Sequence, residues 1–277
     1  MEREEVVLGG RMKLPEYEWV QFRKTPLRLV IGQVRFTIMP RFEQKAFIAS
    51  FQEAVRSDYP RVSREPTVTY QLSPTGISPS PGETLWRFSA RDNRWAVVVG
   101  ESAITLEARG YASIYDFLKR FTAILEAASQ TLEVSDRLRL GLRYINEIRY
   151  LNAENLVEWR TLLNPAFVGF EASSLLDGQV DHTLQEIQVQ RPDGILAIRH
   201  GLLSGTSVAP LLPQEQSVGG RFYLIDLDYY DMTEYDLDIP ATIKQMQNYN
   251  DVMYRFFRWT LTQKLYDYLE PIDARSS

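Results

Sequence analysis

The chain has 277 residues, a formal net charge of −5 at neutral pH and no cysteine. A chain of this length buries roughly three quarters of the surface of its unfolded form, which is enough for a hydrophobic core without covalent or metal cross-links. The lack of cysteine excludes disulfides, thiolate zinc sites, iron–sulfur clusters and cysteine nucleophiles. Hydrophobic residues at 44% and charged residues at 24% are typical of a globular protein.

The N-terminal sequence MEREEVVLGG has acidic residues where a secretory signal has a basic start and then an apolar stretch. No apolar run approaches the ~20 residues of a membrane-spanning helix. We therefore expect a cytoplasmic protein that has no contact with a membrane. The negative net charge argues against a generally basic coat for nucleic acid, but it leaves room for a local basic face.

The first half of the chain is predicted to form a strand, a helix, a group of strands and a second helix. Residues 1–25 have weak periodicity and are expected to form an N-terminal arm. Apolar spacing and β-branched content place the later elements in chain order, at 27–38 (strand), 40–58 (helix), 68–109 (four short strands with a flexible loop at 73–82) and 114–128 (helix). Ser113 is the expected N-cap of the second helix.

The second half repeats this order. Its predicted elements are a strand at 138–150, a helix at about 153–163, strands at about 183–190, 194–200 and 221–230, and a last helix at about 241–269. The first strand of each half begins with Leu-Arg-Leu and continues to a glycine, Gly32 in one half and Gly141 in the other. The sequence therefore predicts an internal duplication.

Two such units favour an α+β fold in which tandem strand–helix–antiparallel strands–helix units form one curved sheet backed by long helices. This element order is that of the TATA-binding-protein-like and helix-grip architectures, and two ferredoxin-like units are the main alternative. The expected organisation is an arm (1–25), a first α+β unit (26–134) and a second α+β unit (135–277).

Four segments, PLRLVIGQVRF, WRFSARDNRWAVVV, LEARGYASIYDFLKRF and RLRLGLRYIN, together resemble a sporadically distributed bacterial family of uncharacterised proteins. The resemblance extends from Pro26 to Tyr268, and it rests on the combination of the four segments. It brings no catalytic residue to this chain. The patchy distribution of the family implies mobile or strain-specific genes, and so suggests a role in phage defence or in a toxin–antitoxin module.

The acidic run DLDYYDMTEYDLD contains a candidate metal site. On a strand, Asp226 and Asp228 point to the same face about 7 Å apart, close enough to share a magnesium ion through oxygen and water ligands. The alternative is a solvated strand end followed by acids that favour the positive end of the next helix.

The strand RLRLGLRYIN is apolar on one side and basic on the other, because Arg137, Arg139 and Arg143 alternate with leucines. These arginines are candidate ligands for phosphate or carboxylate groups, and Gly141 leaves a gap in the row where a ligand can approach. The alternative is that they pair across the sheet with acids such as Glu107 or Glu186.

Two histidines occur in the chain, His182 and His200. His200 precedes the loop GLLSGTS, which superficially resembles a phosphate cradle, so it is a candidate ligand-binding residue. The lysine and the following helix of a phosphate-binding loop are missing, however, and a structural role at a strand end is the alternative. Neither a nucleophile elbow nor a dinucleotide-binding fingerprint is present.

We therefore predict a non-enzymatic binding or scaffold protein that has no cofactor and uses an open sheet face to bind a partner protein or nucleic acid, or to form a homo-oligomer. The enzymatic alternative is a magnesium-dependent hydrolase of a nucleotide or RNA, in which Asp226 and Asp228 hold the metal and Arg139 and Arg143 bind phosphate.

Overall fold

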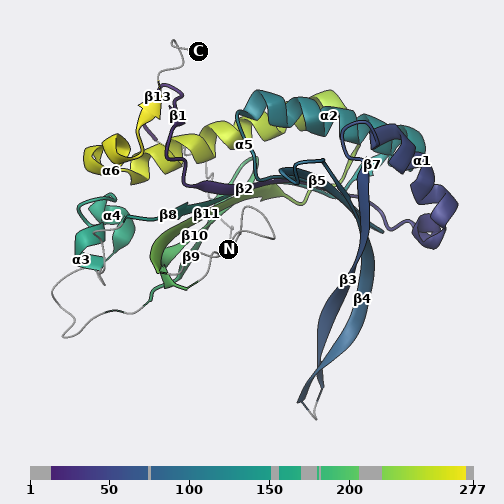
Figure 1. Cartoon of the computed structure of the whole chain (residues 1–277), viewed down its shortest axis with the longest axis horizontal. Helices are drawn as coiled ribbons and strands as arrows, with labels where there is room; N and C mark the ends of the chain where they lie inside the picture. The colour runs from purple at the N-terminus through teal and green to yellow at the C-terminus, as the bar shows by residue number, and fades with distance from the viewer. Residues whose placement is uncertain are drawn as a thin grey trace, which may run out of the picture.

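The computed structural model describes residues 14–73, 76–150, 156–169, 180, 182–205 and 220–272. In these ranges the chain forms an α+β fold with one curved, nine-stranded antiparallel sheet (Figure 1). The α+β class and the curved antiparallel sheet predicted from the sequence are confirmed. None of the helices in the described ranges is long and apolar enough to cross a lipid bilayer.

The nine strands come from both halves of the chain. From the first half they are β2 (Leu27–Arg35), β3 (Arg61–Ser73), β4 (Gly76–Ser89), β5 (Trp95–Gly100) and β6 (Ala103–Ala108); from the second half they are β8 (Arg139–Ile148), β9 (Gln185–Arg191), β10 (Gly194–Ser204) and β11 (Arg221–Asp231). Their order across the sheet is β3-β4-β5-β6-β2-β8-β11-β10-β9.

This order places the first strand of each half at the centre of the sheet. β2 and β8 pair antiparallel with each other. On its other side each pairs with the last strand that its own half contributes to this sheet, β6 for β2 and β11 for β8. The strands of residues 26–134 therefore occupy one side of the sheet, and those of residues 135–277 the other.

In the described ranges the helices are η1 (Pro40–Glu43, a 3₁₀ turn), α1 (Lys45–Val55), α2 (Ile114–Thr131), α3 (Leu156–Trp159), α4 (Pro165–Val168), α5 (Ile239–Thr260) and α6 (Gln263–Tyr268). The long helices α2 and α5 run over the same side of the sheet (Figure 1). Ser113 caps α2 as predicted, because its hydroxyl accepts a hydrogen bond from the Asp116 amide at 3.2 Å.

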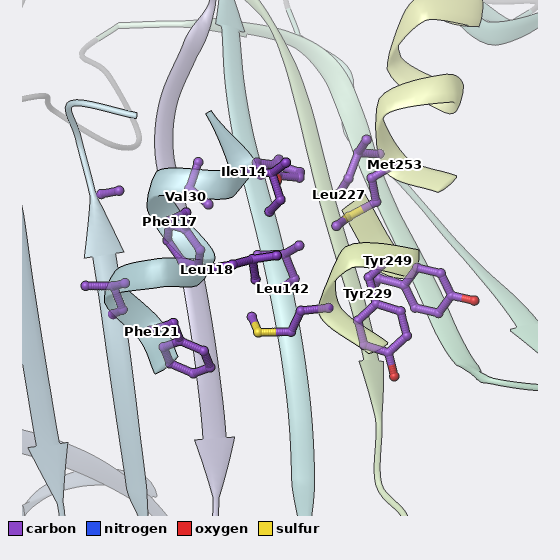
Figure 2. Close-up of a cluster of buried hydrophobic side chains, with 14 of the residues drawn as sticks. Val30, Ile114, Phe117, Leu118, Phe121, Leu142, Leu227, Tyr229, Tyr249 and Met253 are labelled. Carbon is purple, nitrogen blue, oxygen red and sulfur yellow. The ribbon is translucent and has the colours of Figure 1, made fainter. Parts of the chain in front are cut away.

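The main core lies between these two helices and the sheet. Figure 2 shows Phe117 and Phe121 of α2 on one side and Tyr249 and Met253 of α5 on the other. All four side chains are fully buried, and so are the residues beneath them, which include Val30, Leu142 and Leu227. Burial of apolar surface at about 25 cal/mol per Å² makes this layer the main source of stability.

Gly32 lies on the helix-facing side of β2, beneath side chains of both α2 and α5. A Cβ atom at this position would lie 2.8 Å from the terminal methyl of Met246 and 2.9 Å from the ring of Phe117. The glycine therefore allows one residue from each long helix to pack against the backbone of the central strand.

The last helix is shorter than the sequence predicted, because it ends at Thr260 and a separate helix, α6, follows. Residues 162–164 cause the break: the Asn164 amide donates to the Thr260 carbonyl at 2.8 Å, and the Thr262 amide donates to the Leu162 carbonyl at 3.0 Å. The predicted helix at 153–163 is also reduced, to the single turn of α3; residues 151–155 lie outside the described ranges.

The flexible loop predicted at 73–82 is a second correction. Apart from residues 74 and 75, which are not described, this segment belongs to the β3–β4 hairpin. Its prolines are tolerated because this outer part of β4 has β3 on one side and, among the described residues, no strand on the other. Prolines within sheets are largely confined to such edge strands, since a proline cannot donate to a neighbouring strand.

The described part of the N-terminal arm crosses α5. Its short strand β1 (Gln21–Phe22) pairs with β13 (Pro271–Ile272) near the other end of the chain. The Tyr254 hydroxyl of α5 accepts a hydrogen bond from the Val20 amide at 2.9 Å and donates one to the Glu18 carbonyl at 2.8 Å. Residues 1–13 of the predicted arm lie outside the described ranges.

Candidate functional site: a charged sheet face

The sheet has a second face, opposite the long helices, that bears two groups of ion pairs. We call it the charged face and define it by five arginines (Arg87, Arg109, Arg139, Arg143, Arg199), five acids (Glu65, Glu107, Glu186, Asp226, Asp228) and the polar residues Gln33 and Thr105. Strand alternation creates this face, since the leucines between Arg139 and Arg143 point to the helices.

Arg143 and Asp226 form the best-defined pair on this face. Nε of Arg143 donates to Oδ1 of Asp226 at 2.7 Å, and Nη2 donates to Oδ2 at 2.6 Å, so the interaction is bidentate. The Asp226 side chain is only 5% exposed, which limits screening by water. The hydrogen bonds with Asp226 raise the pKa of Arg143 above its ordinary value, against the opposing effect of burial.

Asp226 also contacts Arg199, which extends the group to the edge of the sheet. Nη1 of Arg199 lies 3.6 Å from Oδ2 of Asp226, and Nε of Arg199 donates to Glu186 at 2.8 Å. Arg199 stands directly across from both acids in the strand register. Charges therefore alternate in sign from β8 through β11 and β10 to β9.

Arg139 forms the link from the charged pairs to the centre of the sheet. One terminal nitrogen lies 3.4 Å from Oδ2 of Asp228, and the other donates to Oε1 of Gln33 at 3.1 Å. Its guanidinium also packs over the Tyr230 ring. The same side chain fills the gap that the sequence predicted at Gly141, because a Cβ there would clash with the Arg139 guanidinium.

A second group of ion pairs lies on β3 to β6. Arg87 donates to both oxygens of Glu107, at 2.9 and 3.2 Å, and to Glu65 at 2.6 Å. Arg109 donates to Glu107 at 2.8 Å. Burial opposes ionisation of Glu107, but the bonds and charges of the two arginines outweigh it and lower the pKa of this carboxyl. Glu107 therefore stays ionised and paired with both arginines at neutral pH.

The two sites predicted separately from the sequence lie together. The candidate metal ligands, Asp226 and Asp228, share a face as predicted, but they contact Arg143 and Arg139, the candidate phosphate ligands. The arginines of β8 thus pair across the sheet, although with these aspartates and not with Glu107 or Glu186.

Arg137 lies apart from this face. It belongs to β7 (Asp136–Arg137), which pairs with β12 (Tyr235–Asp236) and not with the main sheet. Its guanidinium donates to Gln245 of α5 at 3.0 Å and lies 3.4 Å from Asp231; the side chains of the pair are each only 5% exposed. The Arg137 side chain therefore joins α5 to the end of β11.

His200 is also on the helix-facing side. It lies within β10, which continues to Ser204, so it does not end its strand. Its ring stacks on Phe167 of α4 with centroids 4.0 Å apart, and its Nδ1 is 2.9 Å from the Tyr223 hydroxyl. The side chain is almost fully buried, and burial lowers its pKa to about 4.

A metal ion at Asp226 and Asp228 would compete with bound guanidinium groups. Both oxygens of Asp226 accept hydrogen bonds from Arg143, and burial raises the pKa of Asp228, which disfavours its charged form. Across the described ranges, no group of three or more histidine, aspartate or glutamate side chains is arranged to hold a metal.

The two aspartates are expected to differ in their effect on stability. Asp226→Asn removes the charge from a buried bidentate pair and should lower the free energy of unfolding by about 2 kcal/mol. Asp228→Asn, whose one ion pair is longer, should cost less than about 1 kcal/mol. Urea unfolding of both variants measures the difference, and equal costs would contradict the assigned pairing.

Arg199 and Arg87 were missed as site residues by sequence reasoning. The signal was present, since each alternates with apolar neighbours on its strand, but partners on other strands become known only from the register. No protein-family model and no curated protein matches the chain in comparisons of its sequence.

Proposed function

We propose that this chain is a non-enzymatic binding protein that engages a partner protein through the charged face. The supporting observation is the paired, partly buried charge network on a broad sheet surface, which none of the described helices covers. Within the same proposal, the bacterial family resemblance supports a cytoplasmic role in a phage-defence or toxin–antitoxin system.

The charge balance of this face favours a protein over a nucleic acid. Its ion-pair network contains five arginines and five acids, whose charges balance, and the adjoining ion pairs of Glu147 with Arg28 and Arg149 add one positive charge. Binding of nucleic acid draws most of its affinity from unneutralised basic groups that displace counterions from phosphates. A protein surface of mixed charge is complementary to such a network without needing a net potential.

The curvature of the sheet supports a TATA-binding-protein-like arrangement over a helix-grip one. In Figure 1 the two ends of the sheet, at β3–β4 and at β9–β10, bend away from α2 and α5. A helix-grip sheet instead wraps around its helix. The charged face therefore belongs to the concave side, where a partner contacts strands of both halves.

Substitutions of partly exposed residues on this face test the proposal without disturbing buried pairs. Tyr230→Ala removes a ring beside Arg139, whereas Tyr115→Ala removes a 72%-exposed ring from α2 and is the matched control. Wild type and both variants are used to capture proteins from a lysate of the source cells, and each captured protein is then purified and titrated by calorimetry.

We expect wild type and Tyr115→Ala to bind the purified partner with similar affinity, and Tyr230→Ala to bind at least tenfold more weakly. Equal binding by all three proteins would reject the charged face as the interface. A monomer without any partner in size-exclusion chromatography would count against a binding role. If the chain instead binds single-stranded DNA tightly and with a steep dependence on salt, the partner is a nucleic acid and not a protein.

A further inference from the structure

A cavity of about 180 Å³ lies on the helix side of the sheet, under the described part of the N-terminal arm. The arm forms one wall with Trp19, Val20 and Phe22, and α5 forms another with Met253 and Phe257. The floor is made by the central strands. The charged face is on the other side of the sheet, so this cavity is separate from the proposed interface.

The cavity is lined mainly by apolar and aromatic side chains, together with the polar side chains of Gln21, Thr25, Asn146 and Asn250, and none of the described residues that line it is charged. A charged ligand would lose its hydration here without gaining an ionic partner, which is costly. A cavity of roughly 150 Å³ is known to hold a benzene ring. The size and lining thus suit a neutral molecule with one or two aromatic rings.

One polar group at the floor has unused hydrogen-bonding capacity. Asn146 of β8 lines the cavity and is only 5% exposed. Its Nδ2 donates to the Ile225 carbonyl at 3.2 Å, which fixes the orientation of the carboxamide. Within the described ranges no hydrogen bond to its Oδ1 is formed, so an acceptor at the floor is left for a ligand.

A second acceptor follows from a chain of hydroxyl groups. The Tyr144 hydroxyl donates to Oδ1 of Asn250 at 2.8 Å, and it lies 3.3 Å from the Tyr111 hydroxyl. A hydroxyl has a single proton, so Tyr111 must donate to Tyr144. Tyr111 then presents only oxygen lone pairs to the cavity. The Asn146 oxygen and the Tyr111 oxygen are therefore both able to accept a hydrogen bond from a ligand.

We propose that the cavity binds a small neutral aromatic molecule that carries an N–H or O–H donor, of the indole or phenol class. The rings of the ligand pack against the aromatic walls, and its donor bonds to Oδ1 of Asn146, with the Tyr111 oxygen as a second acceptor. The arm closes over the ligand through the hydrogen bonds of Val20 with Tyr254 and of Lys24 with Leu269.

Indole and indene provide the test, because they share a shape and differ in the N–H group. Calorimetric titration of the full chain should show that indole binds and that its affinity relative to indene depends on Asn146. In Asn146→Leu, the ratio of the indene to the indole dissociation constant should fall at least fivefold, because the buried N–H loses its acceptor. Tyr115→Phe, outside the cavity, should leave the ratio unchanged.

Asn146→Ser provides a second variant if Asn146→Leu does not fold. The serine side chain is small, and the substitution removes the carbonyl oxygen of Asn146 from the cavity. A further measurement shows where indole binds and does not depend on either variant. Saturating indole should slow hydrogen exchange at the Val20 and Lys24 amides of the wild type. Failure of indole to bind the wild type, an unchanged ratio in the variants, or unaltered exchange in the arm would each overturn the proposal. Tyr230→Ala should bind indole normally, which separates this site from the charged face.

Discussion

The protein should lose about 3 kcal/mol of its free energy of unfolding as the pH falls from 6.5 to 4, because of His200. Burial lowers the pKa of this histidine from an ordinary 6.5 to about 4, a change that corresponds to roughly 3 kcal/mol. Above pH 6.5 the side chain is neutral in both the folded and the unfolded chain. Below that pH the unfolded chain takes up a proton that folded His200 does not bind until about pH 4, so stability is lost across this window.

Urea unfolding at a series of pH values between 7 and 4 measures this slope. The glutamine of His200→Gln cannot titrate. This variant should be less stable than the wild type at pH 7, but its free energy of unfolding should change much less between pH 6.5 and 5. The exposed His182 is the matched control, and His182→Gln should keep the wild-type slope. A wild-type slope that persists in His200→Gln would show that another group is responsible.

Arg137→Met should destabilise the protein by about 3 kcal/mol, because it leaves the Asp231 carboxylate buried without its cation. Asp231 would retain hydrogen bonds from Gln245 at 3.0 Å and Tyr249 at 2.9 Å. These neutral donors replace only part of what a guanidinium supplies. The loss should appear as a lower urea midpoint with an unchanged slope of free energy against urea.

An exposed pair provides the control for this experiment. Arg56 lies 3.2 Å from Glu53 on α1, with both side chains more than half exposed, and Arg56→Met should cost less than about 0.5 kcal/mol. Adding Asp231→Asn to Arg137→Met should recover much of the loss, since the uncompensated charge is removed. If Arg137→Met lowers the free energy of unfolding no more than Arg56→Met does, the structural role of the buried pair is refuted.

The sequence was most informative where one periodic pattern decides which face a residue occupies. Alternation in RLRLGLRYIN correctly placed Arg139 and Arg143 on the face opposite the leucines, and alternation in β11 placed Asp226 and Asp228 together. Helical spacing likewise identified α2, and Ser113 identified its start. In these cases local geometry alone determines the direction of a side chain.

Sequence reasoning failed where a distant segment decides the outcome. The helical pattern of 241–269 is continuous, yet backbone hydrogen bonds from residues 162–164 end α5 at Thr260. Arg137 continues the basic alternation of β8, yet the short β7–β12 pairing brings it to Asp231. Neither contact can be predicted from the local sequence pattern.

For this protein the sequence by itself determined the α+β class, the strands and main helices, and the faces on which the charged residues lie, because periods of two and 3.6 residues are local properties of the backbone. Only the tertiary structure decided which charges meet and where a cavity remains. Those outcomes depend on strand register, on the packing of α5 and on the path of the arm, which bring together residues as distant as Val20 and Tyr254.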